Sequence, residues 1–173
     1  MGNNDGGSVA LDMDLHGRLL RLFPAETAHS LRLAMLRFAG KLPFGKWYLR
    51  HTLSPDAQGQ ECEVMGIHFR NRIGVAAGYD TNGDYLRELG AAGFGFVEIG
   101  SVTPRPQPGT PRPRLRRIAK RNSLINNSGA PNRGLEYVMR NVRRRNKHTH
   151  DLVIGCNIGK LTTTPPKNIV KEY

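Results

Sequence analysis

Three short apolar runs separated by helical segments constrain the fold of this chain more than any other feature. They comprise residues 73–77, 94–99 and 152–158, and each is apolar on both faces, as is typical of strands in a parallel sheet covered by helices. One helix is predicted to end at Gly93, and a second to run from Arg133 to about Asn146. A shorter strand is expected over residues 64–69. Alternating strands and helices indicate an α/β fold of β/α units.

Each of the three apolar runs is followed by small and polar residues. Gly78 follows the first, Gly100 and Ser101 follow the second, and Asn157 lies near the end of the third, before Gly159 and Lys160. The carboxyl ends of parallel strands form the ligand-binding face of β/α folds, where glycines let a ligand approach the backbone. One glycine after a strand is usually only a turn, but three such endings predict a site.

Two amphipathic helices are predicted before the sheet. Leucines at positions 11, 15, 19 and 22 share one helical face, and a second helix is expected from Ala25 to a C-cap at Gly40. The expected organisation is a flexible N-terminus over residues 1–10, a helical extension over 11–50 and a β/α part over 61–173. The helical pair could pack on the rest of the protein or lie at a lipid interface.

The charge of the chain is strongly basic and unevenly distributed. The net charge is +12, from 26 Lys and Arg against 14 Asp and Glu. Residues 104–150 hold 13 of the basic side chains and one acidic one, Glu136, so this segment carries the whole excess. Such a segment suits an anionic partner, and the cluster that begins at Arg140 and ends at Lys147 is a candidate nucleic-acid contact. A helix C-terminus, where cations are favourable, is the alternative interpretation.

Other features exclude several classes of protein. Cys62 and Cys156 are 94 positions apart, without the spacing of a disulfide framework or a zinc site, so no metal site is expected. No apolar run approaches the roughly 18–20 residues of a membrane-spanning helix. The polar N-terminus carries Asp5, where a targeting peptide would be basic, so secretion is not expected.

Five motifs together resemble the N-terminal half of the class 2, quinone-dependent dihydroorotate dehydrogenases. They are NRIGVAAGYD at 71–80, GFGFVEIGSVTPRPQP at 93–108, RPRL at 112–115, Ile125-Asn126, and GCNIGK at 155–160. Residues 24–29 are similar to the helical extension of that class. The resemblance implies a partial (β/α) barrel, with about three parallel strands and crossover helices, preceded by an N-terminal amphipathic helical pair.

The same resemblance implies oxidation of dihydroorotate to orotate in de novo pyrimidine biosynthesis. FMN would be the cofactor and ubiquinone the electron acceptor. It also implies a peripheral location on the inner or plasma membrane face; otherwise a cytoplasmic or mitochondrial location is expected.

The family's site residues can be carried over to this sequence by position. Asn126 would bind orotate. Thr81 stands where the family has a lysine that binds the substrate carboxylate, and residues 127–131 depart from the family pattern. The remaining roles are flavin contacts for Ala77, Gly78, Ser101 and Asn157, the last of which would hydrogen-bond the flavin ring or the pyrimidine. His29 and Arg117 would line the quinone tunnel.

The length of the chain gives a further expectation. An eight-stranded barrel takes about 250 residues, and the family's catalytic serine would lie beyond Tyr173, so this chain is expected to be inactive alone. Its open sheet edge would need a partner or the missing half. Two alternatives are a non-catalytic barrel fragment in a larger, RNA-containing assembly and a peripheral membrane-binding module.

Overall fold

A three-stranded parallel sheet is the centre of the structure, a computed structural model that describes residues 19–20, 22–45, 47–49, 61–121, 123–145 and 151–173. The strand order is β3 (Gly74–Val75), β4 (Phe96–Val102) and β7 (Val153–Ile158). Gly74 pairs with Phe96, which also pairs with Val153. The predicted parallel strands are confirmed, although β4 continues through Gly100 and Ser101 instead of stopping at residue 99.

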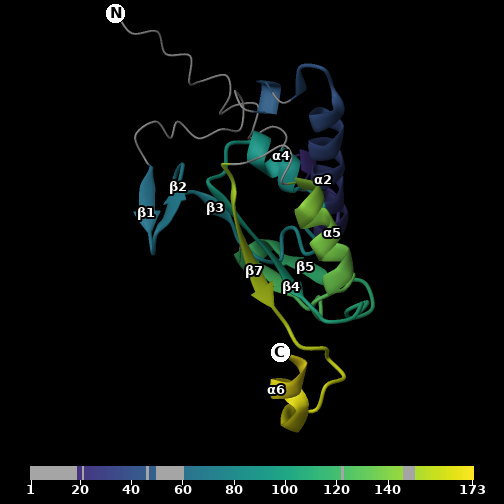
Figure 1. The fold of residues 1–173 in the computed structure, drawn as a ribbon. Coiled ribbons are helices and arrows are strands. Elements are labelled where there is room, and N and C mark those ends of the chain that lie inside the picture. The colour runs from purple at the N-terminus through teal and green to yellow at the C-terminus, as the bar shows by residue number, and fades with distance from the viewer. Residues whose placement is uncertain (1–18, 21, 46, 50–60, 122, 146–150) are drawn as a thin grey trace, which may run out of the picture.

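The hydrophobic core lies between this sheet and the helices α4 (Leu86–Ala91) and α5 (Leu135–Arg145) (Figure 1). Val97 and Ile99 of β4 are almost completely buried, because the central strand has a neighbour on each side. The other buried members of this cluster are Val75, Leu86, Leu89, Val102, Val138 and Leu152. The two crossover helices thus occupy the predicted places between the strands.

The helical extension contributes α2 (Ala25–Lys41), which contacts α4 and the later strand β5. The predicted start at Ala25 is confirmed, but the predicted C-cap at Gly40 is wrong, because the helix continues to Lys41 and its C-cap is Leu42 in an extended conformation. The first predicted helix lies almost entirely outside the described residues, as do the predicted flexible N-terminus and residues 146–150. Ala28 and Leu33 are the buried residues of α2, whereas Met35 and Phe38 of its apolar stripe are exposed.

The prediction of one strand over residues 64–69 is wrong. The structure has a hairpin of β1 (Cys62–Val64) and β2 (Ile67–Phe69), in which Val64 pairs with Ile67. Met65 and Gly66 form the two-residue turn with φ of 54° and 75°. Positive φ at both turn residues matches the twist of the flanking strands, so the chain reverses here.

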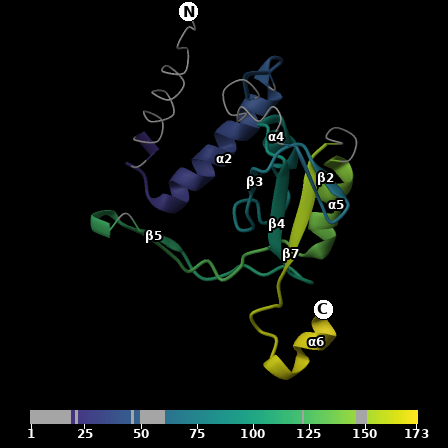
Figure 2. The ribbon, with the colours of Figure 1, turned by 90° about the vertical axis from the view of Figure 1, so that its left-hand side faces the viewer.

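A second antiparallel hairpin follows the sheet's central strand. It consists of β5 (Leu115–Ile118) and β6 (Ser123–Asn126), joined through η1 (Ala119–Arg121). Figure 2 shows it projecting away from the sheet, alongside the start of α2. The chain closes with η2 (Pro166–Asn168) and α6 (Ile169–Glu172), which lie beyond the end of β7 (Figure 1).

Candidate functional site

The carboxyl ends of the three parallel strands meet as the sequence predicts. Gly78 donates its backbone N–H to the carbonyl oxygen of Gly100, at 2.9 Å. Ser101 Oγ donates to Asn157 Oδ1 at 2.6 Å, and Gly159 N–H donates to the Val102 carbonyl at 2.8 Å. These bonds join the chain after β3 to β4, and β4 to β7, so three of the four predicted flavin residues belong to one hydrogen-bonded edge.

Two glycines at this edge are required for different reasons. Gly100 has φ of 116°, and a Cβ there would lie 2.4 Å from the Asn157 carbonyl oxygen, so no side chain fits. Gly78 has φ of 95°, and a Cβ there would meet nothing within 4 Å. Gly78 is exposed and Ala77 half-buried. The backbone at Gly78 is therefore open to a ligand, because no heavy atom lies near the position that a Cβ would take.

Asn157 supplies the polar side chain of this edge. It is exposed, and its Oδ1 is occupied by Ser101. Its Nδ2 donates to no acceptor within the described part of the chain. A carboxamide N–H held in place by a neighbouring hydroxyl is a suitable donor for a carbonyl or ring nitrogen of a bound ligand.

Asn132 fixes the loops that follow these strands, a role that the sequence did not predict. It is buried, and its Nδ2 donates to the Thr81 carbonyl at 2.8 Å and to Asn82 Oδ1 at 3.1 Å. Its Oδ1 accepts the N–H groups of Thr103 at 3.2 Å and Gly134 at 2.8 Å. One side chain thus connects the loops before α4, after β4 and before α5. The sequence did carry a signal, because Asn132 is the asparagine that the chain shares with the family pattern after Asn126, but an asparagine in such a loop ordinarily indicates only a turn.

Asp80 anchors the loop that carries Thr81. It is buried, and its two carboxylate oxygens accept the N–H groups of Asp84 at 2.9 Å and Tyr85 at 2.8 Å. Burial raises the pKa of Asp80, and these backbone hydrogen bonds partly oppose that rise. The carboxylate therefore has a structural role at the start of α4. Thr81 is half-buried.

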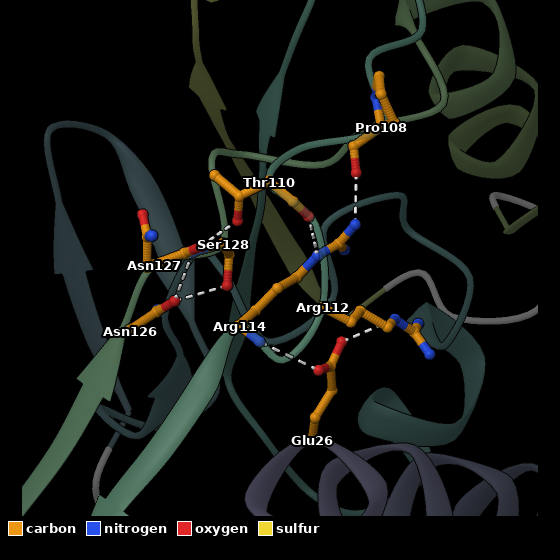
Figure 3. A network of polar contacts seen from close by, with 8 residues as sticks. All are labelled: Glu26, Pro108, Thr110, Arg112, Arg114, Asn126, Asn127 and Ser128. Carbon is orange, nitrogen blue, oxygen red and sulfur yellow. Dashed lines mark hydrogen bonds and ion pairs between the residues drawn. The ribbon is translucent and has the colours of Figure 1, made fainter.

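Asn126, the predicted orotate ligand, is the last residue of β6 and lies on the projecting hairpin (Figure 3). Its Oδ1 accepts hydrogen bonds from Ser128 N–H at 3.1 Å and Ser128 Oγ at 2.5 Å. Asn126 is exposed, and no hydrogen bond links it to Ser101 or Asn157 within the described residues. Among the described residues, Asn126 is therefore not part of the hydrogen-bonded strand-end edge.

The two predicted quinone residues make different contacts. The His29 ring packs edge-on against Tyr79, with ring centroids 5.0 Å apart. Burial lowers the pKa of His29, although a hydrogen bond to the Tyr79 backbone acts in the opposite direction. Arg117 donates from Nη1 to the Phe23 carbonyl at 2.7 Å and from Nη2 to the Leu20 carbonyl at 3.5 Å. Both side chains thus hold the helical extension, His29 from α2 and Arg117 from β5.

An apolar groove of about 800 Å³ lies at the C-terminal half of α2. Its walls include the exposed side chains of Met35, Phe38, Phe44 and Trp47. Neither His29 nor Arg117 is among its lining residues. In the described residues, no helix is long and apolar enough to cross a membrane.

The predicted polyanion contact lies on α5 and extends beyond it. Arg140, Arg143 and Arg144 are exposed, and the end of the cluster falls outside the described residues. The Arg133 guanidinium stacks 3.8 Å from the Tyr137 ring centroid, with Arg140 at 5.8 Å from the same ring. Over the described ranges, no group of three or more His, Cys, Asp or Glu could hold a metal ion.

Comparisons with known proteins support the resemblance noted in the sequence. The dihydroorotate dehydrogenase family model matches residues 60–173. A dihydroorotate dehydrogenase (quinone) from Cellvibrio japonicus is 44% identical over 155 residues, which cover 90% of this chain and 43% of that protein. The protein of the same name from Methylococcus capsulatus is 46% identical over 156 residues, with the same two coverages.

The structural comparison agrees with these matches. A crystal structure of DHODH in complex with ferulenol from Eimeria tenella has a TM-score of 0.66 and 33% identity, over 81% of this chain and 37% of that one. The chain thus spans about two-fifths of the length of the curated relatives that it matches. Fold, motifs and relatives agree, and the chain belongs to the dihydroorotate dehydrogenase family.

Proposed function

We propose that this chain supplies the N-terminal part of an FMN-dependent, quinone-linked dihydroorotate dehydrogenase site. The observation that carries the proposal is the joined edge of β3, β4 and β7, where the Ser101 to Asn157 hydrogen bond lies beside the open backbone at Gly78. Family membership supplies the reaction class. Because the relatives are more than twice as long, dihydroorotate oxidation belongs to the whole protein and not to residues 1–173 alone.

The residues at the strand ends fit a flat aromatic ring. Ala77 and Gly78 have little or no side chain, so a ring can approach their backbone closely. The Nδ2 of Asn157 is available to donate to a ring acceptor, and Ser101 holds that carboxamide in orientation. Bound FMN would accept the hydride of dihydroorotate and pass electrons to a quinone. The protein's contribution here is to hold the ring in a fixed orientation.

The pyrimidine side of the proposed site differs from the family pattern at Thr81. A threonine offers no positive charge to the carboxylate of dihydroorotate or orotate. A hydrogen bond to a charged group contributes about 1.5–3 kcal/mol, so pyrimidine affinity is expected to be about tenfold or more below that of a lysine-bearing relative. Asn126 remains the proposed pyrimidine ligand from the hairpin side.

The quinone side is proposed to be the helical extension. Its exposed groove at the C-terminal half of α2 is lined by apolar side chains, which suits an isoprenoid tail or the surface of a bilayer. His29 and Arg117 attach this extension to the β/α part through Tyr79 and through the residues before α2. Peripheral membrane association follows from this proposal.

Flavin binding by a completed barrel tests the proposal. The chain would be joined to the part of the Cellvibrio japonicus relative that lies C-terminal to its match, expressed, and reconstituted with FMN. Purified protein should be yellow, with absorbance between about 370 and 450 nm. Asn157→Ala should lower the flavin content, whereas Asn168→Ala, at an exposed position in η2, should not.

A folded hybrid, judged by far-ultraviolet circular dichroism, that remains colourless after reconstitution would overturn the assignment of this edge to FMN. Equal flavin contents in Asn157→Ala and Asn168→Ala would remove Asn157 from the flavin site.

A further inference from the structure

Glu26 connects the helical extension to the base of the projecting hairpin. Its Oε1 lies 2.9 Å from Arg112 Nε, and its Oε2 accepts the backbone N–H of Arg114 at 3.3 Å (Figure 3). The Glu26 side chain is 20% exposed and the Arg112 side chain 72% exposed, so solvent screens the ion pair, whereas the hydrogen bond from the Arg114 N–H to the Glu26 carboxylate is part-buried.

The contacts of Glu26 continue into the hairpin through Arg114. The Arg114 side chain donates from Nε to the Thr110 carbonyl and from Nη2 to the Pro108 carbonyl, each at 2.7 Å. These bonds close the loop between Pro108 and Arg114 on itself, directly before β5. Glu26 therefore contacts a loop whose conformation is already fixed by its own hydrogen bonds.

The same loop is bonded to the segment after Asn126. Thr110 donates from its hydroxyl to the Asn127 carbonyl and from its backbone N–H to the Ser128 carbonyl, the latter at 3.0 Å. Asn127 N–H donates to the Arg114 carbonyl at 2.9 Å. Ser128 in turn bonds Asn126 Oδ1. A continuous set of bonds thus runs from the α2 carboxylate to the proposed pyrimidine ligand (Figure 3).

The charge distribution explains why a carboxylate from α2 is required here. Residues 104–150 contain 13 Lys and Arg and a single acidic side chain, Glu136, which lies on α5. The base of the hairpin therefore has no acidic group of its own to balance Arg112 and Arg114. Glu26 supplies that countercharge from a segment 86 positions away from Arg112 in the sequence.

We propose that Glu26 is a positioning residue, through which the helical extension holds the loop of Asn126 in its pyrimidine-binding conformation. This inference rests on the proposed role of Asn126. Because the coupling of two binding events is reciprocal, pyrimidine binding and docking of the extension stabilise one another. The extension then has a second role besides the quinone groove, because it also orders the substrate loop.

A second contact makes the proposal testable without unfolding the protein. Arg117, further along β5, is bonded to the carbonyls of Phe23 and Leu20 and does not depend on Glu26. The hairpin should therefore remain attached to the extension when Glu26 is neutralised. The expected effect is confined to the loop between Pro108 and Ser128.

Hydrogen exchange in the full chain measures the loop directly. In Glu26→Gln, the amides of Asn127 and Thr110 should exchange about tenfold faster, the change expected on loss of a charge-assisted bond. The β4 amides should keep their exchange rates. The matched control is Glu63→Gln, an exposed glutamate on β1, which should leave both sets unchanged.

Arg112→Gln provides the test of mechanism. If Glu26 acts through this arginine, Arg112→Gln added to Glu26→Gln should produce less further acceleration of exchange than Arg112→Gln alone. Equal effects in both backgrounds would contradict that mechanism. Unchanged exchange at Asn127 and Thr110 in Glu26→Gln would overturn the proposal.

Kinetics of the completed hybrid distinguish positioning from general stability. Glu26→Gln should raise KM for dihydroorotate about tenfold while flavin content and kcat change little, because the loop must be ordered at the moment of binding. An unchanged KM in an active hybrid would contradict the inference about Glu26 but not the proposed function. A folded hybrid that binds no flavin would contradict the proposed function. The hydrogen-exchange measurement would still decide whether Glu26 orders the loop.

Discussion

Replacing Asn132 with alanine is expected to be among the most damaging single changes in the loops of this protein. The side chain is buried and bonds Thr81, Thr103 and Gly134 from three different loops. Alanine leaves the Thr103 and Gly134 N–H groups without an acceptor. Thr103 has no exposed surface, and Gly134 is buried, so bulk water cannot reach these donors freely.

The size of the destabilisation follows from the number of N–H groups that lose their acceptor. A buried donor that loses its partner costs about 1–3 kcal/mol, so two such donors give about 2–6 kcal/mol. A water molecule that enters the space of the lost carboxamide would recover part of this, which favours the lower half, about 2–4 kcal/mol. Domains of this kind have a free energy of unfolding of about 5–15 kcal/mol, so the loss is a large fraction of the total.

Urea unfolding of the full chain, followed by far-ultraviolet circular dichroism, measures this loss. With a slope of about 2 kcal/mol per molar urea, the middle of the usual range, the midpoint should fall by about 1–2 M at an unchanged slope. Asn127→Ala is the matched control, because Asn127 is exposed and only its backbone N–H and carbonyl form hydrogen bonds within the described residues. A free energy of unfolding for Asn132→Ala within about 0.5 kcal/mol of that control would refute this account.

Three further predictions concern other parts of the chain. Burial lowers the pKa of His29 from its ordinary value of 6.5, so below about pH 6.5 the unfolded chain binds a proton more readily than the folded chain does. The free energy of unfolding should therefore fall as the pH drops below about 6.5. In urea unfolding at pH 7 and pH 5, His29→Gln should reduce this pH dependence. Met65→Asn should raise the free energy of unfolding by about 0.5–1 kcal/mol, because asparagine tolerates the φ of 54° and Met65 is 96% exposed; an unchanged urea midpoint would contradict this. If α5 binds single-stranded RNA through Arg140, Arg143 and Arg144, the log–log slope of affinity against salt, measured by fluorescence anisotropy, should become less steep by about 0.7 for each arginine changed to glutamine. An affinity that does not change with salt would exclude a phosphate contact.

The sheet and its site edge were predictable because local pattern and topology agree there. Runs apolar on both faces indicate buried parallel strands, and parallel strands place their carboxyl ends at one edge. That rule alone brings Gly78, Ser101 and Asn157 together, and the structure confirms their proximity. Their contact with FMN stays a prediction.

The two hairpins were less predictable, and the reason differs between them. In β5, Arg116 and Arg117 are adjacent, and all four residues of β6 are exposed, so no apolar face marks either strand. In β1 and β2, the turn places Met65 at a positive φ, where methionine is uncommon. These segments fold as they do because of tertiary contacts, such as those of Arg117 with the start of the extension.

The basic charge of the chain divides into two parts with different consequences. Arg112, Arg114 and Arg117 bind Glu26 or backbone carbonyls, so their positive charge holds the hairpin to α2 and to its own loop. The exposed Arg116, Lys120 and Arg121 lie at the hairpin, and Arg140, Arg143 and Arg144 lie on α5. A net charge of +12 therefore overstates what a polyanion could contact at one place. The family motif RPRL is explained by the docking of the extension, and an anionic partner would have to be recognised by one of the two remaining groups.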